Sequence, residues 1–221
     1  MQKFDTLAPV SAHLDIPAGR IQLIAADRAD TTVEVRPANA AKGRDVKAAE
    51  QVAVDYRDGV LHITAPAAKV LGNPGAVEVT VQLPAGSRVE AKTATAEFRG
   101  VGRLGDVTYA SAHGTVKLDE TASAQLTLQA GDITLGRLGG PARISTQKGG
   151  ITIAEAHRGT VELRTEAGDI TVGAARTTSA TLDAGTAYGR ISNALKNTDG
   201  AAAGLNIQAT TSYGNITARS L

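Results

Sequence analysis

The chain contains no cysteine and no tryptophan, and its 221 residues include only two phenylalanines and four tyrosines. The absence of cysteine excludes a disulfide framework and a thiolate metal site. Because aromatic residues make up 3% of the chain, the core must be built from Val, Ile, Leu and Ala in thin, regular layers. The length suits one large domain or two small ones and is sufficient to bury a core.

The chain also lacks an excess of either charge and a long apolar run. It has 23 Lys and Arg against 22 Asp and Glu, a formal net charge of +1. This balance excludes a polybasic arm or an acidic tail, and basic residues scattered among acids predict no nucleic-acid track. No apolar stretch approaches the roughly 18 residues of a membrane span. The first residues lack the apolar run of a signal peptide, so we expect a cytoplasmic location.

A short motif recurs through the second half of the chain. Its copies share G-x-[IV], in most cases within [ST]-x-x-G-x-[IV]-[ST]. The glycines are Gly114, Gly131, Gly149, Gly168, Gly189 and Gly214, at spacings of 17, 18, 19, 21 and 25 residues. A second apolar column runs between the copies, so each period holds two short alternating segments. Such alternation, bounded by Gly and polar residues, predicts β-strands.

A period near 18 residues is too short for a helix pair or a propeller blade and suits one coil of a β-solenoid. Successive coils that pair about 4.8 Å apart place like residues above one another. The inner ladder expected in chain order is Ile133, Ile151, Ile170, Ile191 and Ile216. The residues that follow them form an outward row of hydroxyls, namely Thr134, Thr152, Thr171, Ser192 and Thr217. Because parallel crossovers favour one hand, we predict an all-β, right-handed parallel β-helix over residues 86–221, with about 18 residues per coil.

Residues 1–85 form a less regular β region. Its expected strands are 11–16, 20–25, 31–36, 51–56, 60–65 and 76–83. The dipeptide Asp58-Gly59 between two alternating runs predicts a hairpin, and residues 41–50 suit a short helical turn or a loop. We expect this region to continue into the solenoid and to cap its first open edge.

The succession GDIT, GGIT, GDIT, GRIS and GNIT, with the opening LDIPAGRIQLIAAD, resembles a bacterial β-strand-repeat family known as "putative adhesin" (domain of unknown function 4097). The resemblance covers most of the chain. It implies a right-handed parallel β-helix and exposure at the cell surface, with no established reaction and no catalytic residues. The coil length also resembles that of bactofilins, cytoskeletal β-helices that polymerise end to end.

Two aspartates occupy one column of the repeat. Asp132 and Asp169 follow corner glycines two coils apart, roughly 9.6 Å at sheet spacing. That separation is near the range of about 6.5–9.5 Å for inverting glycoside hydrolysis. The alternative, which we favour, is that each carboxylate accepts nearby backbone N–H groups at its turn. We therefore expect no enzymatic activity, with a carbohydrate-active enzyme at this pair as the alternative.

Three rings share the column just before the glycine, namely Tyr188, Tyr213 and His113. Rings from adjacent coils can stack into an amphipathic patch that contacts sugar or protein; alternatively they shield the end of the coil stack. The four histidines form no metal-binding motif, and with cysteine absent we expect no metal. Nucleotide-binding motifs are also missing, so we expect no cofactor.

Three residues follow the final GNITA strand, so we expect the edge of the last coil to be unpaired. Self-association through residues 186–218, as a dimer or short polymer, is the predicted outcome. Together these observations favour a non-enzymatic structural or interaction protein that displays regular faces to a protein partner. The alternatives are a polysaccharide-binding module at the tyrosines and the enzyme described above.

Overall fold

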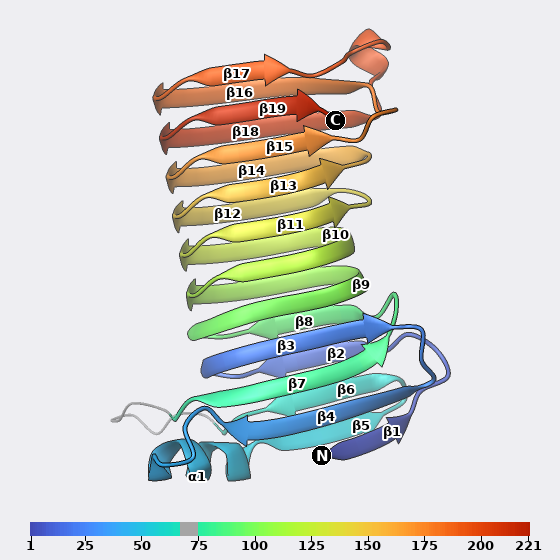
Figure 1. The fold of residues 1–221 in the computed structure, drawn as a ribbon, viewed down its shortest axis with the longest axis vertical. Coiled ribbons are helices and arrows are strands. Elements are labelled where there is room, and N and C mark those ends of the chain that lie inside the picture. Colours follow the sequence, from blue (N-terminus) through green and yellow to red (C-terminus); the bar gives the residue numbers. More distant parts are fainter. Residues whose placement is uncertain (67–74) are drawn as a thin grey trace. The chain divides into compact units, whose positions relative to one another are not determined.

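The computed structural model describes residues 1–66 and 75–221. Two compact units divide the chain, Met1–Thr115 and Val116–Leu221, and each is built mainly from β-strands (Figure 1). The expectation of a mainly β protein is thus confirmed. Among the described residues, helical structure amounts to α1 (Gly43–Gln51) and one 3-10 turn, and no helix there has the length and apolar character to cross a bilayer.

The first unit contains α1 and nine strands. They are β1 (Gln2–Asp5), β2 (Ser11–Asp15), β3 (Ala18–Ala26), β4 (Asp30–Pro37), β5 (Ala53–Arg57), β6 (Val60–Thr64), β7 (Val77–Pro84), β8 (Arg88–Lys92) and β9 (Thr95–His113). All six strands expected before residue 85 are present, whereas β1 was not predicted. Of the two alternatives for residues 41–50, the structure has the helix.

Parallel pairing joins most strands of the first unit. Strand β2 pairs with β6 and β8, and β3 pairs with β7 and β9. The first pair of strands, β2 and β3, therefore lies between two pairs that come later in the chain. Antiparallel pairs join β4 to β1 and β7, and β5 to β6. The β5–β6 connection is the predicted hairpin, with Asp58 at φ 51° and Gly59 at φ 81°, the positive angles that a two-residue turn needs.

The second unit contains ten strands. They are β10 (Val116–Ala130), β11 (Ile133–Leu138), β12 (Ala142–Lys148), β13 (Ile151–Ala156), β14 (Gly159–Ala167), β15 (Ile170–Ala174), β16 (Ala180–Tyr188), β17 (Ile191–Ala194), β18 (Leu205–Tyr213) and β19 (Ile216–Ser220). They form two parallel ladders, one in front of the other in Figure 1. One ladder runs β10–β11–β13–β15–β19–β17, and the other runs β10–β12–β14–β18–β16.

The spatial order of the last two repeats differs from the predicted chain order. Ile170 pairs with Ile216, and Ile216 in turn pairs with Ile191. The repeat β18–β19 has therefore inserted between β14–β15 and β16–β17. Residues 195–204 make this return step, which reverses the direction in which the earlier repeats advance. The prediction that the last repeat of the sequence forms the open edge is wrong, because β18 and β19 have a neighbour on both sides.

Apolar side chains from the two ladders of the second unit fill the space between them. Ile133, Ile151 and Ile170 are fully buried, as are Leu126 and Leu205 in the opposite ladder. Alternation along each strand places one set of side chains inward and the other outward, and the outward hydroxyls pair as predicted, with Thr134 beside Thr152 and Thr171 beside Thr217. Small and medium-sized residues suffice because the layer between the ladders is thin.

The corner glycines are the points of closest approach between repeats. Gly149 has φ 141°, and a Cβ atom there would lie 2.2 Å from the carbonyl oxygen of Gly131. At Gly168 a Cβ would lie 2.0 Å from the Gly149 oxygen, and at Gly214 it would lie 2.0 Å from the Gly168 oxygen. Glycine recurs here because no other residue fits this backbone conformation and this contact.

Gly149→Ala is expected to lower the free energy of unfolding by at least about 2 kcal/mol, since it combines an unfavourable φ with a clash against backbone. Urea denaturation followed by circular dichroism measures the change. Gly185→Ala is the matched control, because a Cβ at Gly185 meets nothing within 4 Å. Equal stability of the two variants would contradict the close-approach account.

Candidate functional site

Tyr188 and Tyr213 form the most prominent aromatic feature of the second unit. They are register partners at the ends of β16 and β18, and their rings lie 4.9 Å apart between centroids, 4° from parallel. The side chains are exposed, at 67% and 60% respectively. Two large rings held flat against each other in solvent offer an amphipathic contact surface with little conformational freedom to lose.

The position of this tyrosine pair follows from the repeat. The strand alternates inward through Thr211 and then ends at the corner, so the residue before each corner glycine leaves the core and becomes exposed. On the side away from Tyr188, Tyr213 pairs with Ala167, a small residue that leaves the edge of the ring pair open. The inserted β18 thus places Tyr213 beside Tyr188 at the end of the ladder.

The predicted third ring, His113, is not part of this pair. It ends β9 in the first unit, whereas both tyrosines belong to the second. Its backbone N–H donates to the Ala94 carbonyl, and its own carbonyl accepts the Ser111 hydroxyl. The backbone of His113 is therefore bound within the first unit, at the end of β9.

Asp132 and Asp169 both bind backbone. An Oδ1 atom of Asp132 accepts the Gly150 N–H at 2.8 Å, and Oδ1 of Asp169 accepts the Asn215 N–H at 2.7 Å. Asn215 repeats the arrangement, because its Oδ1 accepts the Arg190 N–H at 3.0 Å. Each side chain therefore ties its turn to the turn of the neighbouring repeat, which is the role the sequence favoured for these residues.

A row of hydroxyls at the first motif position, buried at Thr165 and Thr211 and half-buried at Thr186, was not recognised from the sequence. Thr165 donates to the Gly149 carbonyl at 3.0 Å, Thr211 to the Gly168 carbonyl at 3.0 Å, and Thr186 to the Gly214 carbonyl at 3.0 Å. The signal was available, since the motif specifies Ser or Thr three residues before the glycine. This spacing lets the hydroxyl reach the corner of the adjacent repeat.

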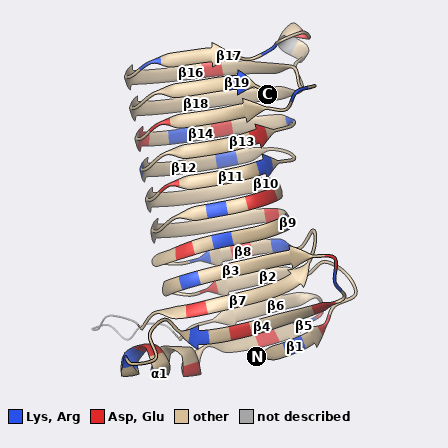
Figure 2. Cartoon of the chain, in the orientation of Figure 1, with Lys and Arg blue, Asp and Glu red and all other residues tan. Residues whose placement is uncertain are grey.

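Lys and Arg are interspersed with Asp and Glu along the strands (Figure 2), and most of these residues are exposed or half-buried. In the second unit, Arg143 Nε lies 2.8 Å from Glu162 Oε2, and this contact raises the pKa of the arginine. Arg137 lies 3.4 Å from Glu155. These pairs join residues on adjacent strands, so the charges of these four side chains are neutralised locally.

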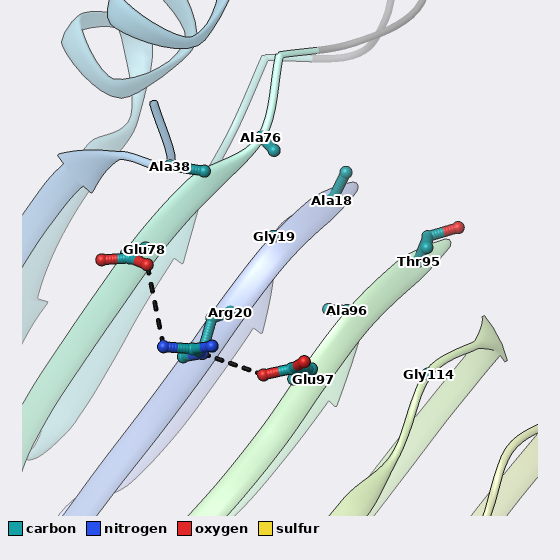
Figure 3. A pocket seen from close by; sticks show the side chains of 10 residues that line it. All are labelled: Ala18, Gly19, Arg20, Ala38, Ala76, Glu78, Thr95, Ala96, Glu97 and Gly114. Atoms are coloured by element: carbon teal, nitrogen blue, oxygen red, sulfur yellow. Dashed lines mark hydrogen bonds and ion pairs between the residues drawn. The ribbon is translucent and has the colours of Figure 1, made fainter. Parts of the chain in front are cut away.

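The first unit has an open cavity of about 420 Å³ at one end of β3, β7 and β9. Its lining is mostly alanine and glycine, and Figure 3 shows Arg20 reaching from β3 toward Glu78 and Glu97 on either side. The Arg20–Glu97 contact is 2.9 Å and the Arg20–Glu78 contact is 3.8 Å. Arg20 therefore pairs with both carboxylates, and none of these three charged side chains is left without a partner. The rest of the cavity lining is mostly apolar.

The histidines provide one further ring contact. His13 and His62 stack 5.2 Å apart between centroids, and His13 Nδ1 lies 3.4 Å from Glu90. Within the described ranges, no group of three or more His, Asp or Glu side chains is placed to hold a metal ion. The stacked pair lies on the ladder formed by β6, β2 and β8, where His13 is the register partner of both His62 and Glu90.

Comparison with known proteins gives one family. Residues 11–219 match the family model described as Toastrack DUF4097. A comparison with curated proteins gives no match.

Several solved structures are similar over nearly their whole length. A "putative lipid binding protein" from Parabacteroides distasonis is 12% identical, with 98% of this chain and 95% of that chain covered and a TM-score of 0.49. A "putative adhesin" from Bacteroides fragilis is 14% identical, with coverages of 98% and 95% and a TM-score of 0.46. A "putative adhesin" from Parabacteroides distasonis is 17% identical, with coverages of 100% and 95% and a TM-score of 0.45.

Asp169→Ala is expected to lower the free energy of unfolding by about 1 kcal/mol, because the Asn215 N–H loses its acceptor. Asp169→Asn keeps a side-chain oxygen at the same place and should retain most of the stability. Glu166→Ala serves as control, since this exposed carboxylate shows no hydrogen bond or ion pair within the described part of the chain. Chemical denaturation of the three variants measures the differences; an Asp169→Ala variant as stable as Glu166→Ala would contradict the structural role.

Proposed function

The chain belongs to the Toastrack DUF4097 family, and we propose that it is a non-enzymatic interaction protein, adhesin-like in that it presents rigid, regular faces to a partner. The exposed stacked pair Tyr188–Tyr213 is the observation that carries this proposal. The Asp132–Asp169 pair, on which an enzyme would depend, instead accepts backbone N–H groups at the turns, so we do not propose acid–base chemistry there.

The scaffold we propose for this display is a right-handed parallel β-helix with about 18 residues per coil in its regular part. In-register parallel pairing of Ile133 with Ile151 and of Ile151 with Ile170 supports it, and right-handed crossovers are the general preference. The reversed step into β18 would then be a local crossover of the opposite hand. Such a scaffold holds side chains at fixed spacing, which favours contact with an extended or repetitive partner.

The partner surface is centred on the tyrosine pair because that pair combines exposure with order. Stacking fixes both rings, so binding would immobilise few additional side-chain torsions. Tyrosine supplies a large apolar face together with a hydroxyl, and it is among the residues enriched at protein interfaces. A protein partner is therefore the first candidate. The boundary at residue 85 and the cytoplasmic location stay predictions from the sequence.

A polysaccharide is the second candidate. Two rings 4° from parallel present flat apolar surfaces and edges against which the C–H face of a sugar can pack, with the phenol hydroxyls available for hydrogen bonds. The repetitive chemistry of a polysaccharide also matches a scaffold with repeating faces.

Replacing both tyrosines by alanine is expected to abolish capture of protein partners from a lysate of the native cell by the immobilised chain, because the contact surface is removed. Quantitative mass spectrometry compares the captured proteins. The double Tyr→Phe variant keeps the rings and should retain partners that depend on stacking, while Thr134→Ala/Thr152→Ala changes an outward pair elsewhere in the second unit. An unchanged set of captured proteins with the double alanine variant would overturn the assignment of the tyrosines.

A polysaccharide array tests the second candidate separately. Binding should fall at least tenfold in the double alanine variant, because two aromatic contacts worth about 0.5–1.5 kcal/mol each are lost and about 1.4 kcal/mol corresponds to a factor of ten. In the double phenylalanine variant, which keeps the rings, binding should fall by no more than about threefold. Polysaccharide binding that survives in the double alanine variant, or its absence in the wild-type chain, would remove this candidate.

A further inference from the structure

The second unit ends in a pair of strands that the chain order does not reveal. Within the described residues, β16 pairs with β18 and β17 pairs with β19, and no further strand lies on their outer sides. The open edge is therefore formed by residues 180–194, in both ladders at once. In Figure 1 these strands lie beyond β18 and β19.

The core at this edge is incompletely covered. Ile191 is 46% exposed, whereas Ile216, its register partner, is 1% exposed and Ile133 is fully buried. Leu182 and Ala184 also point inward yet are only partly buried. Apolar groups that continue the buried columns of the inner repeats thus remain in contact with water.

The loop after β17 covers one end of this edge and leaves the rest open. The Lys196 carbonyl accepts the Ala180 N–H at 3.1 Å, and Ser179 Oγ accepts the N–H groups of Thr198 and Asp199 at 3.0 and 3.1 Å. All these contacts lie at the start of β16. From Leu182 to Tyr188 the outer side of β16 has no such cover among the described residues.

The edge also carries few of the residues that usually protect edges. Residues 180–194 contain neither Lys nor Pro, and their two charged residues are Asp183 and Arg190. Natural edge strands are commonly guarded by charges, prolines or bulges. In the first unit, β1 and β5 carry such charges at Lys3, Asp5, Asp55 and Arg57. The contrast indicates that the β16–β17 edge is used for pairing.

We propose that this edge binds a second copy of the same chain, edge to edge, in an isologous dimer. The occupant must present two strands, one for each ladder, with an apolar layer between them, and the same edge of a second copy has that form. A single extended peptide would pair with one ladder and leave Ile191 or Leu182 exposed. One Asp and one Arg give the edge zero net formal charge, so two copies meet without like-charge excess.

A two-fold axis across this edge pairs the strands of the two copies antiparallel and consumes both edges, which closes the assembly at two chains. The contact is modest, because β16 has 9 residues and β17 has 4, fewer than the roughly 20–30 per partner of a standard interface. The dimer should therefore form in the micromolar range of concentration. Tyr188 ends β16 and so borders this edge. The dimer is argued from the unpaired strands and from Ile191, so failure of either binding assay does not count against it.

Sedimentation velocity from about 1 to about 500 µM tests the proposal. The wild-type chain should pass from monomer to dimer, and Ile191→Lys should raise the dissociation constant at least tenfold by placing a charge in the apolar layer of the interface. Thr210→Lys is the matched control, because it adds the same charge to an exposed position of β18, one strand away from the edge; its dissociation constant should stay within about twofold of wild type.

A wild-type monomer over the whole range, growth beyond the dimer, or equal dimerisation of Ile191→Lys and wild type would overturn the proposal. Hydrogen exchange of the wild-type chain keeps the test decisive if the lysine variant fails to fold. Amides of residues 180–194 should exchange more slowly at high than at low protein concentration. Concentration-dependent protection that falls elsewhere and spares this segment would also overturn it.

Discussion

The second unit depends on the backbone contact at its corners. Four corner glycines, Gly131, Gly149, Gly168 and Gly214, donate their N–H to the adjacent repeat, as Gly149 does to the Ala167 carbonyl and Gly168 to the Tyr213 carbonyl. The glycine carbonyl accepts a threonine hydroxyl from that same repeat, Thr165 for Gly149 and Thr211 for Gly168. A Cβ atom on the following glycine would collide with that carbonyl. Hydrogen bonds and steric exclusion therefore act at one point, and together they set the register in which Ile, Thr and charged residues align across neighbouring strands.

The same contact identifies which repeat lies on which. Thr186 donates to the Gly214 carbonyl, and the Asp169 carboxylate accepts the N–H of Asn215. These hydrogen bonds place the corner glycines in the spatial order Gly168, Gly214, Gly189, which differs from their order in the sequence. In the first unit, the first strand pair β2–β3 is likewise inserted between later pairs. In both units the pair nearest a chain end thus gains neighbours on both sides. The exposed positions, Tyr188 and the β16–β17 edge, follow from this arrangement.

Much of this architecture could be predicted from the sequence, because period-2 alternation and the recurring glycine are local signals. They identified the strands of the first unit other than β1, the Asp58-Gly59 hairpin, the inward isoleucines and the tyrosine column, and they favoured a structural role for Asp132 and Asp169. The order of the last two repeats could not be predicted, since both carry the same corner motif and either satisfies the same hydrogen bonds. The cavity around Arg20 depends on how distant segments of the first unit meet, which no local pattern encodes.

The order of repeats is the central claim, and paired cysteines measure it directly because the chain has no cysteine of its own. Thr171 and Thr217 are register partners on adjacent strands, whereas Ser192 lies one strand further on. Adjacent partners lie about 4.8 Å apart, within reach of a disulfide, and residues two strands apart lie at about 9.6 Å, beyond it. Oxidation should therefore cross-link Thr171→Cys/Thr217→Cys rapidly and leave Thr171→Cys/Ser192→Cys reduced, as judged by mass spectrometry after protease digestion. Efficient cross-linking of the second pair with failure of the first would show that the repeats follow chain order and would contradict the account.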